Sequence, residues 1–214
     1  SNSTKVGRSE VTGNGTAGRM MPDGRIAVAG LSVSRETFLA LEDFSALVKR
    51  WNPAINLVSK TTIPDFWNRH ILDSAQLFTL CPAQARLWLD LGSGGGLPGI
   101  VIAILARELR PDLRVVMVES DQRKATFLRE ACRSLNLRAD IHSARIESLP
   151  PMRADVLSAR ALAPLATLLA HAERHLAPEG VALFPKGGQH ETELAEARKL
   201  WSFEARLMPS LSDD

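Results

Sequence analysis

The sequence contains no tyrosine, only seven phenylalanines and four tryptophans, and only two cysteines, Cys81 and Cys132. So few aromatic rings provide no evident stacking platform for single-stranded RNA. Two cysteines are too few for a disulfide framework and indicate a reducing compartment, so we expect a cytoplasmic protein. Neither cysteine has the spacing of a metal site, and we expect no bound metal.

Long apolar runs and a strong net charge are also missing. No stretch of about 18 uncharged apolar residues is present, which argues against a membrane-spanning helix, and no signal-peptide pattern opens the chain. The 26 lysines and arginines nearly balance the 24 aspartates and glutamates, leaving a formal net charge of +2. We therefore expect any contact with nucleic acid to come from local basic patches and not from a global field.

Glycine, by contrast, is concentrated in one place. Between Leu89 and Ile100, five of twelve residues are glycines. Residues 86–91 are apolar enough for a buried strand, and an apolar helical pattern begins at Pro98, a residue that suits the first turn of a helix. Glycines let the backbone approach a ligand closely, and the helix N-terminus offers unpaired N–H groups. Strand, glycine loop and helix in this order predict a cofactor site at the carboxyl edge of a parallel sheet.

Two cofactors fit such a loop. Residues 94–99 match the dinucleotide pattern G-x-G-x-x-G, which is a weak signal by itself. The register Gly92, Gly94, Gly96 agrees better with the end of the strand, and Asp90 places a carboxylate under the loop. That carboxylate does nothing for a pyrophosphate, whereas it attracts the ammonium and sulfonium groups of S-adenosylmethionine. The loop favours S-adenosylmethionine over NAD; a tight turn without a ligand is the weakest alternative, since so many glycines destabilise a plain turn.

The chain before residue 85 divides into two parts. Residues 1–30 are rich in Gly, Ser, Thr and Asn and predict a flexible tail. Residues 31–84 predict a helical extension, with an amphipathic helix over 34–50 that Trp51-Asn52-Pro53 stops, and a second helix over 64–80.

One face of the second predicted helix is polar. Arg69, His70 and Asp73 lie three or four residues apart and share this face. The spacing is compatible with a salt-bridged helix surface, which the sequence alone favours, or with a polar edge beside the glycine loop.

Residues 85–214 alternate strands with helices, which predicts a Rossmann-like α/β domain whose parallel sheet is covered by helices. The expected strands are 86–91, 113–119, 138–142, 154–159 and 181–185, with a possible sixth at 203–208. The expected helices are 98–109, 121–136, 163–176 and 191–201.

Several residues stand at the carboxyl ends of these strands. Glu119 ends the second strand, where an acid typically binds ribose hydroxyls; the alternative, a helix cap, suits Asp121 better. Ile146 follows the third strand and would contact adenine. Arg160 ends the fourth strand, at the edge where chemistry occurs in an open parallel sheet. The helix over 121–136 also has a basic outer face, which would either contact RNA phosphates or simply be solvated; it carries Arg123, Lys124, Arg129 and Arg133.

Taken together, these residues resemble the RsmG family, also called glucose-inhibited division protein B. The resemblance spans roughly residues 41–188 and is carried by a set of short motifs: Trp51-Asn52, Asn56-Leu57, Arg69-His70-Ile71-Leu72-Asp73-Ser74, the loop from Asp90 to Gly99, Glu119-Ser120, Arg145-Ile146-Glu147, Ser158-Ala159-Arg160-Ala161 and Lys186-Gly187. It implies an S-adenosylmethionine-dependent methyltransferase fold and methylation of a guanine N7 in bacterial 16S ribosomal RNA.

The resemblance also implies roles for individual residues. Cofactor contacts would come from Gly92, Leu97, Ile146 and Glu147, with Arg160 lining the same site. The pocket that faces the RNA would contain Arg69, His70, Asp73 and Lys186. In two respects the chain departs from the pattern: nothing after Met208 supplies the usual antiparallel seventh strand, and the tail before Gly30 has no counterpart.

Other nucleic-acid methylations leave marks that are missing here. Methylation of an exocyclic amine calls for an Asn/Asp-Pro-Pro-aromatic loop where this chain has Ser158-Ala159-Arg160-Ala161, and methylation of a pyrimidine carbon needs a cysteine nucleophile near the top of the sheet. Guanine N7 has a free lone pair and no proton to lose, so we expect no general acid or base, only alignment. We expect Arg160 and Lys186 to hold guanine O6 or nearby phosphates.

Three other functions remain open at this point. They are a methyltransferase that acts on a small molecule or a protein, an NAD-dependent Rossmann enzyme, and a non-catalytic RNA-binding module. For the favoured function we expect a monomer that binds 16S ribosomal RNA or the small ribosomal subunit with strongly salt-dependent affinity.

Overall fold

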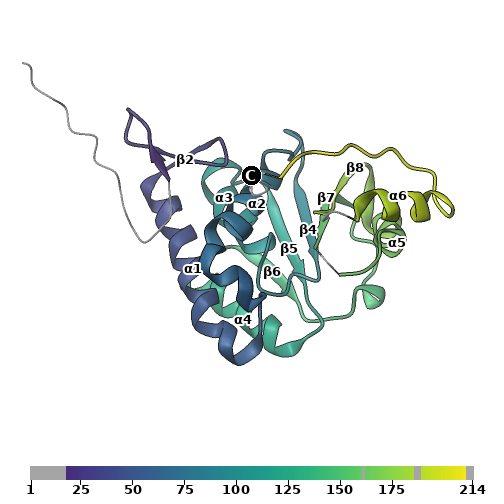
Figure 1. The fold of residues 1–214 in the computed structure, drawn as a ribbon, viewed down its shortest axis with the longest axis horizontal. Helices are drawn as coiled ribbons and strands as arrows, with labels where there is room; N and C mark the ends of the chain where they lie inside the picture. The colour runs from purple at the N-terminus through teal and green to yellow at the C-terminus, as the bar shows by residue number, and fades with distance from the viewer. Residues whose placement is uncertain (1–17, 161, 186–188, 211–214) are drawn as a thin grey trace, which may run out of the picture.

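The computed structural model describes residues 18–160, 162–185 and 189–210. At its centre lies a sheet of five parallel strands in the order β6-β5-β4-β7-β8 (Figure 1). The glycine loop follows the central strand, at the point where the strand order reverses, which is where open α/β sheets bind ligands. The strands are β4 (Leu87–Leu91), β5 (Arg114–Val118), β6 (Ala139–His142), β7 (Ala154–Ala159) and β8 (Leu176–Leu183).

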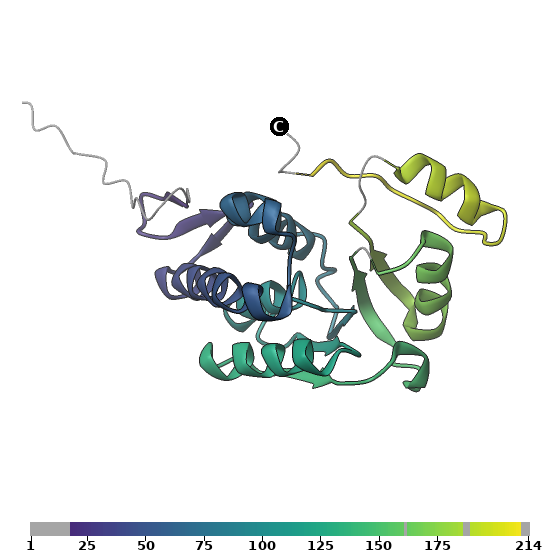
Figure 2. The ribbon, with the colours of Figure 1, turned by 60° about the horizontal axis from the view of Figure 1, so that its bottom comes forward.

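Each face of the sheet is covered by its own group of helices. Trp88, Val115 and Met117 belong to a core shared with α3 (Gly99–Leu109) and α4 (Gln122–Ser134). Their neighbours in sequence, such as Leu89 and Val116, belong to a second core that includes Leu168 of α5 (Leu165–His175). The alternation follows from the two-residue period of a strand. Figure 2 shows α3 and α4 on one side, and α5 with α6 (His190–Arg198) on the other.

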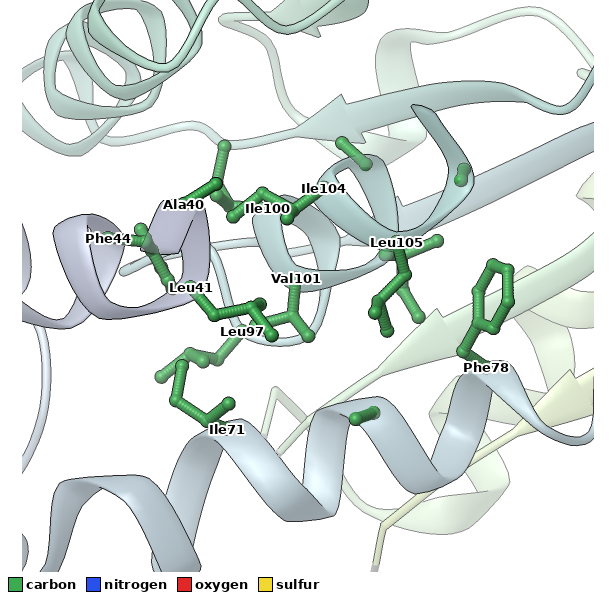
Figure 3. Packing of buried hydrophobic residues seen from close by; sticks show 14 of the residues in the cluster. Ala40, Leu41, Phe44, Ile71, Phe78, Leu97, Ile100, Val101, Ile104 and Leu105 are labelled. Carbon is green, nitrogen blue, oxygen red and sulfur yellow. The ribbon is translucent and has the colours of Figure 1, made fainter. Parts of the chain in front are cut away.

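Helix α3 fixes the end of the glycine loop. All residues from Gly99 to Ala106 are buried. Figure 3 shows Ile100 on the side of α3 that faces Ala40 and Phe44 of α1 (Arg35–Ile55), and Leu105 near Phe78. Burying an aliphatic side chain of this size contributes roughly 1.5–3 kcal/mol. The first turn of α3 is therefore held rigidly, and so is the loop that enters it.

The helical extension differs from the prediction in its details. Ser34 caps α1 as expected, since its hydroxyl oxygen accepts a hydrogen bond from the Thr37 amide at 3.1 Å. The predicted stop at Trp51-Asn52-Pro53 is wrong, because α1 continues through Pro53 to Ile55 and is capped by Asn56, which has a left-handed φ of +51°. A proline this close to the helix end removes a single backbone hydrogen bond, and asparagine tolerates the left-handed cap.

The second predicted helix is irregular. It consists of a 3-10 segment, η1 (Lys60–Asp65), a π-helical turn, η2 (Trp67–Leu72), and the short helix α2 (Asp73–Phe78). A π-helical turn widens the helix locally, and such turns are frequent at functional sites.

Residues 18–30, which the sequence places in a flexible tail, are ordered in the structure. They contribute β1 (Arg19–Met20) and β2 (Ile26–Val28) to a small antiparallel sheet with β3 (Leu31–Val33). Ile26 and Val28 are buried in the same core as α1 and α3, which explains why this segment is held in place.

The C-terminal region also departs from the prediction. Strand β8 begins at Leu176, five residues earlier than expected, with an irregular register opposite β7. No strand forms over 203–208; that run leads from α6 back toward α2, where Gln76 Nε2 donates to the Pro209 carbonyl at 2.7 Å. Because this run does not pair with β8, the main sheet has five strands among the residues described.

Candidate cofactor and substrate site

The glycine loop depends on backbone angles that other residues rarely adopt. Gly92, Gly94 and Gly96 have φ values of +62°, +52° and +84°. A Cβ atom at Gly96 would lie 2.5 Å from Ile100 Cγ1, so that glycine is needed for packing. At Gly94 the nearest atoms to a Cβ would be the Gly92 carbonyl oxygen and Glu119 Oε1, at 3.8 and 3.9 Å. One side of Gly94 is therefore open, bordered by oxygen atoms.

Glu119 connects this loop to the end of β5. Its Oε1 atom accepts a hydrogen bond from the Gly94 amide at 3.1 Å, and its Oε2 atom accepts one from the Asp121 amide at 3.4 Å. The residue is 8% exposed. Asp121 performs the capping role expected of it, since it accepts from the Arg123 and Lys124 amides. Asp121 and not Glu119 is therefore the cap of α4, and the Glu119 carboxylate lies directly beside the open side of Gly94.

Asp90 lies beneath the loop and not on its surface. It is 1% exposed. Its Oδ1 atom accepts a hydrogen bond from Ser158 Oγ at 2.8 Å, its Oδ2 atom accepts one from the Gly99 amide at 3.1 Å, and Trp88 Nε1 donates to Ser158 Oγ at 2.9 Å. Burial raises the pKa of Asp90 to about 6, against the opposing effect of the hydrogen bond from Ser158. Both carboxylate oxygens thus hold the strand end and the first turn of α3 together.

Arg160 and His70 meet across the molecule although they are 90 positions apart. Arg160 Nη1 lies 3.3 Å from His70 Nδ1, and His70 Nε2 lies 2.8 Å from Thr62 Oγ1. Burial, then the charges of Arg160 and Arg69, lower the pKa of His70 to about 4. Burial also lowers the pKa of Arg160, while the charges of Asp73 and Asp90 act in the opposite direction.

The residues of the polar helix face predicted from the sequence therefore fall into a buried group and an exposed one. His70 is 7% exposed and, together with Asp73, lies close to the end of β7. Arg69 has a side chain that is 55% exposed and pairs with Asp65 at 3.9 Å, as an ordinary helix surface does. Ser210 Oγ donates to Asp73 Oδ1 at 2.7 Å, so the C-terminal run reaches the same place.

The other residues predicted for the site lie away from the contact between Arg160 and His70. Ile146, in the 3-10 turn η3 (Ile146–Ser148), is buried in the core on the α5 side of the sheet. Glu147 is exposed and lies 3.8 Å from Arg145. Leu97 is buried where the loop packs against α1 and η2 (Figure 3). Lys186 lies outside the described residues.

Comparison with known proteins assigns the chain to a family. The sequence matches the family described as "GidB: rRNA small subunit methyltransferase G" over residues 38–212. The chain belongs to this family. The Ribosomal RNA small subunit methyltransferase G of a Cereibacter sphaeroides strain is 59% identical over 186 residues, which are 87% of this chain and 90% of the relative. The enzyme of the same name from Ruegeria sp. (strain TM1040) is 53% identical, over 90% of this chain and 93% of the relative.

Solved structures agree with the fold of the methyltransferase G family. A putative O-methyltransferase from Klebsiella pneumoniae superimposes with a TM-score of 0.50 and 21% identity, over 75% of this chain and 76% of that one. At this identity the likeness concerns the fold alone, which is the Rossmann-like fold of S-adenosylmethionine-dependent methyltransferases. Membership of the methyltransferase family, and not the fold, sets the NAD-dependent alternative aside.

The described residues of this chain fit S-adenosylmethionine. The open side of Gly94 leaves room for close approach to the backbone, which a Cβ atom would fill. The neighbouring Glu119 carboxylate is an acceptor suited to hydroxyl groups, and a carboxylate beside the loop suits a cationic ligand better than a pyrophosphate.

The described residues offer neither a membrane-spanning helix nor a cluster of metal ligands. No helix there is long and apolar enough to cross a membrane. The same residues contain no group of three or more His, Cys, Asp or Glu side chains placed to hold a metal ion.

Sequence reasoning missed three residues of this site. Thr62 belongs to no recognisable sequence motif, and only the fold brings its hydroxyl close to His70. Ser158 lies inside an apolar strand, where its link to Trp88 and Asp90 depends on strand register. Leu162 lies so close to Gly92 that a Cβ there would approach its Cδ1 atom to 2.7 Å. A short polar residue within a buried strand, as at Ser158, was the one usable signal.

Proposed function

We propose that this protein transfers the methyl group of S-adenosylmethionine to N7 of a guanine in 16S ribosomal RNA, and that it acts in the cytoplasm as a monomer on naked RNA or on the small ribosomal subunit, without a metal. Membership of the methyltransferase G family supports the activity and the RNA substrate. The observation that carries the proposal is the pairing of an open glycine loop beside Glu119 with a half-buried arginine, Arg160, at the end of the adjacent strand.

In this proposal the two halves of the site hold two different molecules. Gly92, Gly94 and Leu97 form the cofactor seat, Glu119 accepts hydrogen bonds from the ribose hydroxyls, and Ile146 and Glu147 lie toward the adenine. Asp90 keeps the loop and the first turn of α3 in register from below. Arg160 donates to guanine O6, a frequent arginine acceptor, which leaves N7 unblocked.

The bound cofactor supplies an electrophilic methyl group. Transfer of this group to the guanine N7 lone pair would leave the cofactor as a neutral thioether and the purine with the positive charge. No proton has to leave the purine, and no side chain has to act as a base. Positioning the two reactants contributes on the order of 7–11 kcal/mol in well-aligned systems. Asp73 then offers negative charge on the side of the purine that becomes cationic.

Arg69, His70, Asp73 and Lys186 are proposed to line the RNA-facing side. His70 and Asp73 are close to Arg160, and Arg69 is exposed on the same turn. Exposed basic residues of α4, such as Arg123 and Arg129, would add sequence-independent contacts to phosphates.

The proposal is tested by methyl transfer to small-subunit particles from cells that lack the gene. Mass spectrometry of nuclease digests should reveal 7-methylguanosine at one position of 16S RNA with the wild-type protein. Arg160→Ala should reduce the rate at least about tenfold, equivalent to about 1.4 kcal/mol. Arg114→Ala, which removes the same charge at the opposite, amino end of β5, should retain activity. Full activity of Arg160→Ala, or methylation of another atom, would contradict the proposal.

A further inference from the structure

Three side chains and one carbonyl form a series beside the end of β7. Arg160 Nη1 is 3.3 Å from His70 Nδ1, His70 Nε2 is 2.8 Å from Thr62 Oγ1, and Thr62 Oγ1 is 2.8 Å from the Ser59 carbonyl oxygen. The Phe66 ring packs against the imidazole, with 5.0 Å between ring centroids, so packing holds the plane of the ring.

Donor and acceptor chemistry fixes every hydrogen in this series. A guanidinium only donates, so His70 Nδ1 has to accept and carries no hydrogen. The neutral imidazole then carries its hydrogen on Nε2 and donates it to Thr62 Oγ1. A carbonyl only accepts, so the Thr62 hydroxyl donates to Ser59, and its lone pair stays available to His70. No other arrangement of the neutral groups leaves all three contacts satisfied.

The surrounding charges agree with a neutral His70. Burial, Arg160 and Arg69 lower its pKa to about 4, while Asp73 and Asp90 act on the neighbouring Arg160. A second hydrogen on the ring would face the guanidinium as a donor against a donor, and as a charge against a like charge.

We infer that Thr62 is a positioning residue: its hydroxyl selects the Nε2–H tautomer of His70, and the resulting Nδ1 lone pair orients Arg160. This inference rests on the proposed function for the role of Arg160, and adds a residue for which the sequence shows no motif. Without the Thr62 hydroxyl, the hydrogen on His70 Nε2 loses its acceptor, so only Arg160 still favours this tautomer, and the other tautomer, whose Nδ1–H points at the guanidinium, gains population. Arg160 then loses its acceptor and the guanine-facing geometry with it.

Two substitutions at one position separate this role from simple packing. Thr62→Val keeps the shape but removes the hydroxyl, and Thr62→Ser keeps the hydroxyl but removes a methyl group. The ¹⁵N chemical shifts of His70 report the tautomer directly and do not depend on enzyme activity. We expect wild type and Thr62→Ser to show a protonated Nε2 and a bare Nδ1, and Thr62→Val to show a mixture of tautomers.

Kinetics test the coupling to Arg160. Thr62→Val should lower kcat for methyl transfer roughly three- to tenfold, in line with the loss of one neutral hydrogen bond, with cofactor affinity unchanged. Thr62→Ser should restore most of the rate. In an Arg160→Ala background, Thr62→Val should cause no further loss, because the two residues act through one path. Thr61→Val removes the neighbouring exposed hydroxyl, which contacts only Ser59 Oγ among the contacts shown, and is the matched control.

The outcomes are decisive. A protonated Nδ1 in the wild type, an unchanged tautomer in Thr62→Val, or additive losses in the double variant would overturn the inference. A wild-type protein that methylates no ribosomal RNA but shows the Thr62-dependent tautomer would refute the proposed function, while supporting the part assigned to Thr62.

Discussion

Replacing Gly94 with alanine distinguishes the contribution of the loop to folding stability from its contribution to cofactor binding. The residue has a φ of +52°, and its Cβ would meet nothing closer than 3.8 Å. Gly24 has a φ of +81° in a surface turn, with nothing within 4 Å of its Cβ position. Both substitutions therefore introduce the same kind of backbone strain without a steric clash. Only the one at Gly94 fills space in front of the proposed cofactor site.

The expected magnitudes follow from these geometries. A left-handed backbone costs an L-residue roughly 1–2 kcal/mol, so the melting temperature of each variant should fall by roughly 2–8 °C in a domain of this size. At Gly94 the added methyl group also overlaps the bound cofactor. Overpacking of this kind typically costs 1–3 kcal/mol, and cofactor affinity should fall by about tenfold or more.

Calorimetry and melting curves measure the two effects separately. At a cofactor concentration about 100 times the dissociation constant, binding should stabilise the wild type by about 2.7 kcal/mol. Gly24→Ala should gain the same increment from S-adenosylmethionine, and Gly94→Ala should gain much less. NAD should stabilise none of them. If Gly94→Ala binds the cofactor as tightly as Gly24→Ala, the cofactor does not approach the open side of Gly94 and the reasoning fails.

Three further predictions follow from other parts of the structure. Glu108→Gln should destabilise the protein by about 3 kcal/mol at neutral pH. Burial of Glu108 raises its pKa, but hydrogen bonds from Thr37, Ser34 and Arg25 outweigh burial and hold the pKa at about 2 instead of 4.5. A difference of one in pKa between the folded and unfolded states corresponds to about 1.4 kcal/mol of stability. This contribution is complete above pH 4.5 and disappears as the pH falls toward 2, so denaturant midpoints of wild type and variant should converge in acid; a constant gap would contradict the assignment. Ser158→Ala should cost roughly 2–4 kcal/mol in chemical unfolding, because it leaves two buried polar groups without a partner, whereas Ser148→Ala on the exposed η3 turn should be nearly neutral. RNA affinity should fall at least about tenfold between 50 and 200 mM salt, and a flat response in a filter-binding titration would argue against phosphate contacts.

The sheet was predictable because its signals are local. Strands β4, β5, β6 and β7 begin and end within two residues of the ranges expected from their apolar runs. Each run is bounded by a glycine, a charged residue or a helix cap, so neither burial nor pairing was needed to find it. The glycine loop was predictable for the same reason.

The N-terminal sheet was not predictable because its strands are two or three residues long. Ile26 and Val28 are apolar, but their burial depends on the α1 and α3 core, which the sequence does not reveal. The π-helical turn over Trp67–Leu72 and the extension of α1 past Pro53 likewise depend on tertiary packing. The run 203–208 has strand-like residues, yet no partner strand takes it up.

The sequence predicted the residues of the candidate site better than the contacts among them. Glu119 and Arg160 were found from their places at strand ends, which a parallel sheet brings to one edge. Asp90 was found from its nearness to the loop, but its depth below the loop depends on Ser158 and strand register. The contact between His70 and Arg160 spans 90 positions, a separation at which no local pattern carries information.

The bond between Asp90 and Ser158 has a consequence for the spacing of the whole site. Asp90 stands two residues before Gly92, Ser158 stands two residues before Arg160, and the two strands are paired at this position. In the proposed site, the gap between methyl donor and acceptor base would thus be set by the pairing of two central strands inside the sheet. A substitution in the loops around this edge of the sheet would then leave that gap unaltered, because the paired strands set it.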